Sequence, residues 1–149
     1  MSFQRPADYA GELSVGDAYA LLKQDQKAEL VDVRTQAEWT WVGVPDLSGL
    51  GKTPIFIEWA SYPGMRPAAD FAQRVIAELT ARGADQETPV LFLCRSGVRS
   101  LAAARALASA GWRRCYNISE GFEGGLDAGT RRRGASGGWR ARGMPWTQT

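Results

Sequence analysis

The stretch PVLFLCRSGVRSLAAARALA, from Pro89 to Ala108, joins a short apolar run to an alanine-rich run through a polar loop. PVLFLC is too short for a buried helix and is typical of a strand that is covered on both faces. The alanine-rich run favours a helix, which we expect to end near Gly111. The stretch therefore predicts a strand, a loop and a helix, with Cys94 placed where the strand ends.

Helical and strand patterns alternate along the rest of the chain. The expected elements, in chain order, are a helix capped by Ser14, a strand over 28–33 (AELVDV), a short helix capped by Thr35, a strand over 54–59 (PIFIEW), a helix from Pro67 to Gly83, a strand over 114–118 (RCYNI), and a short helix after SEGFEGG at 119–125. This alternation predicts an α/β domain whose mostly parallel sheet carries helices on both faces. Such sheets bind ligands beyond the carboxyl ends of their strands, which is where Cys94 lies.

The length of the chain, 149 residues, suits a single domain. We expect the core to cover about residues 9–125. The segment 126–149 is rich in glycine and arginine, and we expect it to be a loop and a C-terminal tail that packs back on the core through Trp139 and Trp146. The three arginines at 131–133 are expected to lie in a solvated loop.

Composition excludes several classes of function. Hydrophobic residues make up 44% of the chain and charged residues 23%, which is typical of a globular protein, and a net charge of +2 favours neither nucleic acid nor a membrane as partner. No apolar run approaches the roughly 20 residues that cross a bilayer, and no signal peptide is evident, so we expect a cytoplasmic location. With two cysteines and no histidine, neither a disulfide framework nor a zinc site is expected. We expect no metal and no cofactor.

The loop after Cys94 has the composition of an anion-binding site around a nucleophile. Loop amides and the N-terminus of the following helix are directed toward the space above the cysteine. Together with Arg95 and Arg99 they favour a thiolate over a thiol, so no histidine base is required. Gly97 allows a tight turn, and Ser100 can offer its hydroxyl to the sulfur. A lone cysteine is more often a small buried hydrophobe, but core packing does not require the polar residues that follow this one.

The second cysteine, Cys115, has a different setting. It lies within a strand pattern beside Tyr116 and Ile118, with no anion-binding loop next to it. We expect Cys115 to be buried and structural, and the alternative is a resolving thiol.

Four segments together resemble the rhodanese-like sulfurtransferases. They are LVDVRTQAEW at 30–39, CRSGVR at 94–99, EGFEGG at 120–125 and GWRARGMPW at 138–146. The family carries a persulfide on the cysteine of a six-residue loop, within a three-layer sandwich of helices around a central sheet. The resemblance implies that Cys94 carries the sulfur, and that the residues around this sulfur are Arg95, Ser96, Gly97, Val98, Arg99 and Ser100. At Asp32 and Arg34 we expect structural pairing, with Glu38 as the partner of Arg34.

The reaction that the resemblance implies is transfer of sulfane sulfur from a small donor to a thiophilic acceptor, which could be a thiol or a protein. Arg95 and Arg99 make the loop positive, and this favours a dianionic donor such as thiosulfate over mercaptopyruvate. The oligomeric state stays open at this point.

Two other functions remain as alternatives. A cysteine phosphatase or an arsenate reductase also holds an anion above a thiolate, but phosphatases place five residues between cysteine and arginine, whereas four separate Cys94 from Arg99. Phosphatases also commonly have histidine where Leu93 stands. A non-catalytic or redox-sensing rhodanese-like module is the second alternative, because oxidants also attack an accessible thiolate.

Overall fold

A five-stranded sheet forms the centre of the molecule. The computed structural model describes residues 8–61, 64, 66–125 and 137–148. The sheet has the order β1-β8-β7-β2-β4, and every neighbouring pair is parallel. Its strands are β1 (Gly11–Leu13), β2 (Glu29–Asp32), β4 (Ile55–Phe56), β7 (Val90–Leu93) and β8 (Cys115–Ile118). The prediction of a mostly parallel α/β sheet is confirmed.

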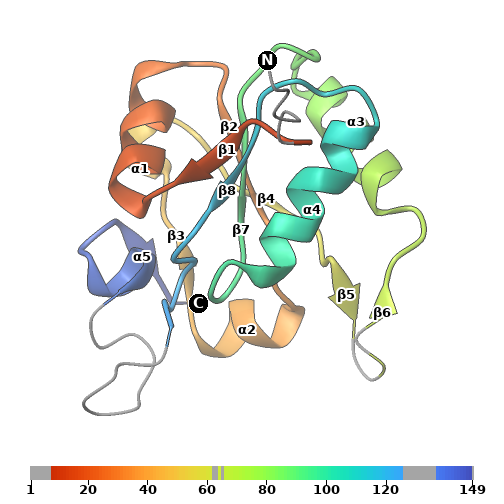
Figure 1. The fold of residues 1–149 in the computed structure, drawn as a ribbon. Helices are drawn as coiled ribbons and strands as arrows, with labels where there is room; N and C mark the ends of the chain where they lie inside the picture. The colour runs from red at the N-terminus through yellow and green to blue at the C-terminus, as the bar shows by residue number, and fades with distance from the viewer. Residues whose placement is uncertain (1–7, 62–63, 65, 126–136, 149) are drawn as a thin grey trace, which may run out of the picture.

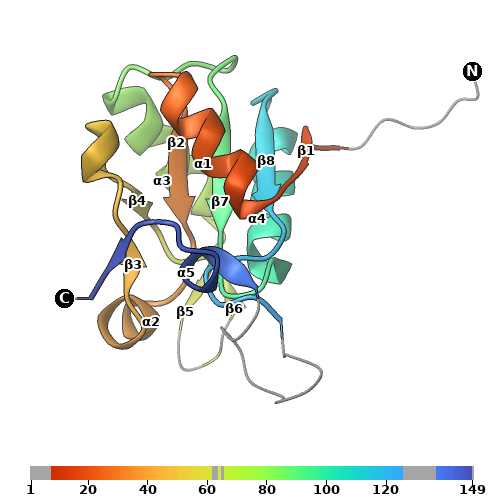
Figure 2. The ribbon, with the colours of Figure 1, turned by 90° about the vertical axis from the view of Figure 1, so that its left-hand side faces the viewer.

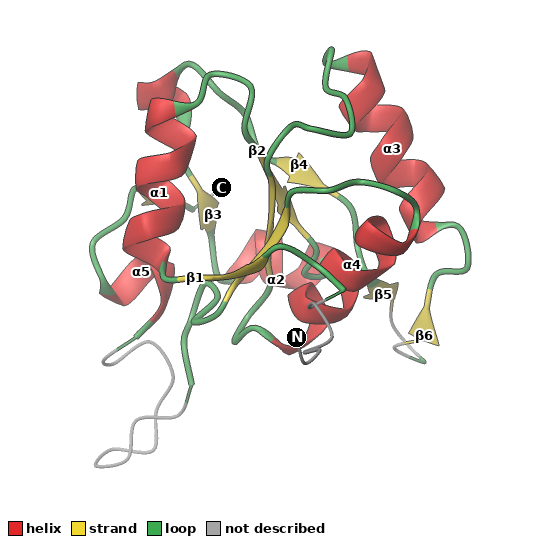
Figure 3. Cartoon of the chain, turned by 45° about the horizontal axis from the view of Figure 1, so that its top comes forward, coloured by secondary structure: helices red, strands yellow, loops and turns green. Residues whose placement is uncertain are grey.

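Helices cover both faces of this sheet. They are α1 (Val15–Gln24), α2 (Gln36–Trp41), α3 (Phe71–Ala81), α4 (Val98–Ser109) and α5 (Gly138–Ala141). Helices α3 and α4 lie on one face, and α1 and α5 lie on the other (Figure 1, Figure 3). Figure 2 shows α1 and α5 in front of the sheet, while α2 lies below the carboxyl ends of the central strands. None of the described helices has the length and apolar character needed to cross a bilayer.

The two central strands supply two separate cores, because successive side chains of a strand point to opposite faces. Val31 of β2 and Phe92 of β7 belong to the core beneath α3 and α4. Leu30 and Leu91 belong to the core beneath α1 and α5. The same alternation directs Cys94, two residues after Phe92, into the first core. The side of the sheet on which the thiol lies is therefore set by strand periodicity.

Short elements complete the fold at the two ends of the sheet. They are a 3-10 turn η1 (Ser48–Leu50), an antiparallel pair formed by β3 (Val44–Pro45) and β9 (Trp146–Thr147), and a second antiparallel pair formed by β5 (Ala60–Ser61) and β6 (Arg66–Pro67). The β3–β9 pair joins the end of the chain to the segment that follows α2.

The described part of the C-terminal segment packs on the core. Trp139 is wholly buried in the second core, and its indole N–H donates to the carbonyl of Pro145 at 2.6 Å. The ring of Trp146 meets Phe122 edge to face, with ring centroids 6.2 Å apart. The arginines at 131–133 lie outside the described residues.

One of the expected helix positions is wrong at its start. The helix expected from Pro67 begins at Phe71, because Pro67 pairs within β6 and the N–H of Ala68 donates to the carbonyl of Trp59. The segment 119–125 forms turns, the residues directly after it lie outside the described part of the chain, and the short helix described next is α5 at Gly138–Ala141. The strands β1, β3, β5, β6 and β9 were not expected, because runs of two or three residues show no periodicity of their own. The capped starts at Ser14 and Thr35 and the strands β2, β7 and β8 are confirmed.

A buried ion pair lies at the end of β2. The Arg34 guanidinium donates from Nη2 to Asp32 Oδ2 at 2.7 Å and from Nε to Asp32 Oδ1 at 2.9 Å, and both side chains are wholly buried. Nη2 also donates to the carbonyl of Gly43, and the guanidinium lies 4.2 Å from the centre of the Phe122 ring. The expected pairing of Arg34 with Glu38 is wrong. Asp32 stands two residues before Arg34 on the same side of the chain, and the guanidinium pairs with its carboxylate instead.

We predict that Arg34→Leu lowers the free energy of unfolding by about 3–5 kcal/mol, because it leaves the Asp32 carboxylate buried without its partner. Urea unfolding followed by circular dichroism measures this change. The matched control is Arg105→Ala, which removes an exposed pair with Asp8 and should cost less than about 1 kcal/mol. Equal costs for the two variants would show that burial does not decide the strength of the Asp32–Arg34 pair.

Candidate functional site

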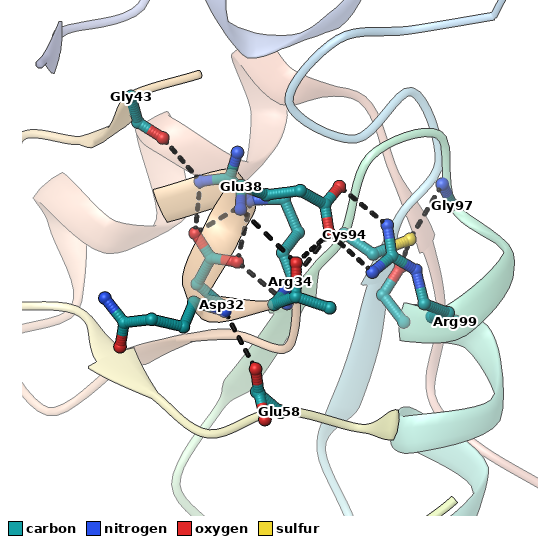
Figure 4. A network of polar contacts seen from close by, with 11 residues as sticks. Asp32, Arg34, Glu38, Gly43, Glu58, Cys94, Gly97 and Arg99 are labelled. Carbon is teal, nitrogen blue, oxygen red and sulfur yellow. Dashed lines mark hydrogen bonds and ion pairs between the residues drawn. The ribbon is translucent and has the colours of Figure 1, made fainter. Parts of the chain in front are cut away.

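Cys94 lies between the end of β7 and the start of α4, with only 1% of its surface exposed. Its sulfur accepts a hydrogen bond from the backbone N–H of Gly97 at 3.1 Å (Figure 4). The sulfur also lies 3.2 Å from the hydroxyl oxygen of Ser100. The thiol therefore sits at the N-terminus of a helix of 12 residues, where amide groups and the helix dipole favour negative charge. The structure brings together Cys94, Gly97 and Ser100, as the sequence led us to expect.

Gly97 is required by its surroundings. Its φ of 105° lies in the region that favours glycine, and an added Cβ would approach the carbonyl oxygen of Ser119 to 2.4 Å. The backbone of Gly97 therefore passes so close to the turn after β8 that no side chain fits there.

That turn supports the cysteine loop directly. The N–H of Phe122 donates to the carbonyl of Cys94 at 2.8 Å, and the N–H of Glu123 donates to the carbonyl of Arg95 at 2.9 Å. Gly121 has a φ of 69°, and a Cβ there would lie 2.5 Å from the Arg95 carbonyl oxygen. EGFEGG is therefore explained by close backbone approach to the cysteine loop.

Arg99 is held by a carboxylate from α2. Its guanidinium donates to the two Glu38 carboxylate oxygens at 2.7 and 2.9 Å (Figure 4). Glu38 also accepts from the backbone N–H and the hydroxyl of Thr35, so the same carboxylate closes the capping box of α2. Burial acts to raise the pKa of Glu38, but the hydrogen bonds from Arg99 and Thr35 outweigh it and lower the pKa to about 2. The charge of Arg99 is therefore largely offset.

The other loop residues differ in exposure. Arg95 is exposed and makes no ion pair with any described residue, and Val98 is 76% exposed. Ser96 is partly buried. Among the described loop residues, Arg95 is thus the positive group that remains open to an anion approaching from solvent.

A polar chain behind the sulfur was not anticipated from the sequence. Asn117 of β8 lies with its side-chain oxygen 2.5 Å from Ser100 Oγ, and its amide N–H groups donate to Glu12 Oε1 at 2.8 Å and to the Gly97 carbonyl at 3.1 Å. Glu12 stands directly opposite Asn117 in the β1–β8 pairing. No local pattern reveals this contact, because it depends on the pairing of two strands about a hundred residues apart.

Cys115 is wholly buried, as expected. Its thiol donates to the carbonyl of Trp112 at 3.4 Å, and burial raises its pKa to about 12. At neutral pH this thiol stays protonated, which suits a core residue. In the described part of the chain no group of three or more cysteine, aspartate or glutamate side chains is placed to hold a metal ion.

Residues 10–149 match a protein family described as the STR4 middle domain. The chain belongs to this family. An uncharacterised protein of Rickettsia prowazekii (strain Madrid E) is 36% identical over 129 residues, which cover 87% of this chain and 90% of that protein. The rhodanese-like domain-containing protein 4 of Arabidopsis thaliana, described as chloroplastic, is 26% identical over 148 residues, which cover 97% of this chain and 27% of that protein.

Solved structures agree with this STR4 middle-domain assignment. Rv0390 from M. tuberculosis is 46% identical and superposes with a TM-score of 0.81, covering 95% of this chain and 99% of that one. The polysulfide-sulfur transferase homodimer from Wolinella succinogenes is 25% identical with a TM-score of 0.59, covering 96% and 81%. The resemblance to rhodanese-like proteins is confirmed, and the chain has the fold of a sulfurtransferase-type domain.

We predict that the Glu38–Arg99 pair makes stability depend on acid pH. Because the pKa of Glu38 falls from 4.5 to about 2, its contribution is fully present above about pH 4.5 and is lost as the pH falls toward 2. The free energies of unfolding of wild type and Glu38→Gln should differ by about 1–2 kcal/mol near neutral pH, since water screens this partly buried pair. As the pH falls toward 2, the free energies of unfolding of the two proteins should become equal. A constant difference across the acid range would contradict the assignment.

Proposed function

We propose that this protein is a sulfurtransferase that carries sulfane sulfur as a persulfide on Cys94, taking it from thiosulfate or a related donor and passing it to a thiophilic acceptor. The observation that carries the proposal is the position of the Cys94 sulfur at the N-terminus of α4. There the sulfur accepts a hydrogen bond from the Gly97 N–H and lies within hydrogen-bonding distance of the Ser100 hydroxyl. The relationship to a protein named as a polysulfide-sulfur transferase supports the same class of reaction.

The first half-reaction loads the cysteine. The Cys94 thiolate attacks the outer sulfur of thiosulfate, a bond forms between the two sulfurs, and the bond to the sulfite sulfur breaks with its electron pair leaving on sulfite. The product is a Cys94 persulfide. We assign the surroundings of the transferred sulfur to the loop residues Arg95, Ser96, Gly97, Val98, Arg99 and Ser100.

The second half-reaction unloads it. An acceptor thiolate, or cyanide in an assay, attacks the outer sulfur of the persulfide, and the bond to Cys94 breaks. The electron pair stays on the Cys94 sulfur, which returns as a thiolate in the same amide environment. No oxidant or reductant is consumed, since sulfur passes from one nucleophile to another.

Donor recognition falls mainly to Arg95 and to backbone amides. Arg99 is committed to Glu38, so the pair adds little net charge to the loop. Arg95 is exposed, and its positive charge favours a small dianion. This modifies the expectation from sequence that both arginines favour the dianionic donor.

We predict that Cys94→Ser abolishes transfer of sulfur from thiosulfate to cyanide while the fold is retained, because a serine hydroxyl does not ionise near neutral pH. Intact-mass analysis after incubation with thiosulfate should show the gain of one sulfur atom on wild type and none on Cys94→Ser. The matched control is Cys115→Ser, which should keep most of the activity because that thiol is buried and hydrogen-bonded to Trp112. Substantial turnover by Cys94→Ser would rule out Cys94 as the sulfur carrier.

We also predict that Arg95→Gln raises the KM for thiosulfate by about 3- to 10-fold at low salt, with a smaller effect at high salt, because it removes an unpaired charge. The matched control is the double variant Glu38→Gln/Arg99→Gln, which removes one charge of each sign and should change this salt dependence little. Steady-state kinetics at two ionic strengths measure both. If the double variant lost more of the salt dependence than Arg95→Gln does, Arg99 and not Arg95 would be the main residue that recognises the donor.

A further inference from the structure

The side chain of Asn117 has a single possible orientation. Its amide nitrogen faces the Glu12 carboxylate at 2.8 Å and the Gly97 carbonyl at 3.1 Å, and both of these groups only accept hydrogen bonds. The amide N–H groups must therefore point toward them. The side-chain oxygen of Asn117 is left facing the Ser100 hydroxyl at 2.5 Å.

This orientation fixes the proton of Ser100. The Asn117 oxygen can only accept, so the short contact requires Ser100 to donate, and a serine hydroxyl has one proton. The 3.2 Å contact between Ser100 and the Cys94 sulfur then presents a hydroxyl lone pair to the sulfur. A protonated Cys94 satisfies this contact by donating its S–H. A Cys94 thiolate must instead compete with Asn117 for the hydroxyl proton.

We propose that Asn117 is a positioning residue that holds the Ser100 proton while Cys94 is a neutral thiol and releases it to the sulfur when the sulfur is anionic. The hydroxyl rotates between two acceptors, the Asn117 oxygen and the Cys94 sulfur, and no bond between heavy atoms changes. Asn117 is 2% exposed, so an oxygen abandoned by the hydroxyl has little access to water. Each thiolate therefore forms at the expense of one buried hydrogen bond.

The effect on catalysis, which rests on the proposed function, follows from where the negative charge lies. In the persulfide the Cys94 sulfur is bonded to the outer sulfur and carries no charge, so the hydroxyl returns to Asn117. When the acceptor takes the outer sulfur, the electron pair stays on the Cys94 sulfur and the hydroxyl turns back to it. Asn117 thus keeps the thiolate from being stabilised so strongly that it loses nucleophilicity.

Other charged groups lie near the same sulfur, and of these only Glu12 is changed in the tests below. The hydrogen bonds that Arg99 donates to Glu38 are the main cause that raises the pKa of Arg99, and the nearby Cys94 charge adds to this effect. The Asp32–Arg34 pair at the end of β2 and Arg95 in the loop are also charged groups at this end of the sheet. On the far side of Asn117, Glu12 also accepts a hydrogen bond from the hydroxyl of Tyr9.

The test is the pH dependence of Cys94 alkylation by iodoacetamide in a double-mutant cycle, with Cys115→Ser as the common background. Asn117→Leu should shift the midpoint of alkylation to lower pH and speed the reaction about 3- to 10-fold near pH 6.5, because the hydroxyl is freed to serve the thiolate. Ser100→Ala should shift the midpoint upward. Adding Asn117→Leu to Ser100→Ala should then change the midpoint no further.

A purely structural role for Asn117 predicts the same shift in both backgrounds, and that result, or an unmoved midpoint in Asn117→Leu, overturns the proposal. If Asn117→Leu does not fold, the exposed Glu12 gives a second route. Glu12→Ala should lower the midpoint further than Glu12→Gln, which keeps an acceptor for Asn117, and only when Ser100 is present. Equal midpoints for these two variants also overturn it. Alkylation needs no sulfur donor, so failure here is distinguishable from failure of the sulfur-transfer assay.

Discussion

The close approach of two backbone segments, the cysteine loop and the turn after β8, is the constraint on which the site depends. Two glycines allow it, since a side chain at Gly97 or Gly121 would meet a carbonyl oxygen at 2.4 or 2.5 Å. The contact requires β7 and β8 to be parallel neighbours that end at the same level. The C-terminal segment binds to the turn after β8, because the N–H of Trp139 donates to the Gly121 carbonyl. The sheet order, the glycines and the tail thus all bear on where the Cys94 sulfur lies.

Much of this architecture could be predicted because its signals are local. The apolar run before Cys94, the alanine-rich run after it and the caps at Ser14 and Thr35 each specify an element within a few residues. The two- and three-residue strands could not be predicted, since they exist only through pairing with distant segments. The contacts of Asn117 were hidden for the same reason. The partner of Arg34 was missed for a different reason, because Asp32 lies only two residues away. Two arginines and two acidic side chains allow several pairings, and only the three-dimensional arrangement selects one.

The site has less uncompensated positive charge than its number of arginines suggests. Arg34 and Arg99 each have a dedicated carboxylate, Asp32 and Glu38, so neither contributes a free positive charge. Attraction of an anion then depends on Arg95 and on dipoles of the backbone. Fixed amides lose little by reorganisation when charge develops on sulfur, whereas a flexible arginine must first be immobilised. The arrangement suits a reaction in which one atom alternates between neutral and anionic forms.

The near-complete burial of Cys94 affects when this cysteine is accessible to other thiols. An empty cysteine with 1% of its surface exposed is shielded from bulky thiols and from adventitious disulfide exchange. A sulfur bound to it extends the side chain by one bond and places the reactive atom farther from the floor of the loop. In the proposed reaction, Cys94 would therefore be protected while it carries no sulfur and would become accessible to an acceptor once it carries a persulfide. The length of one sulfur–sulfur bond would then decide whether an acceptor can reach the reactive sulfur atom.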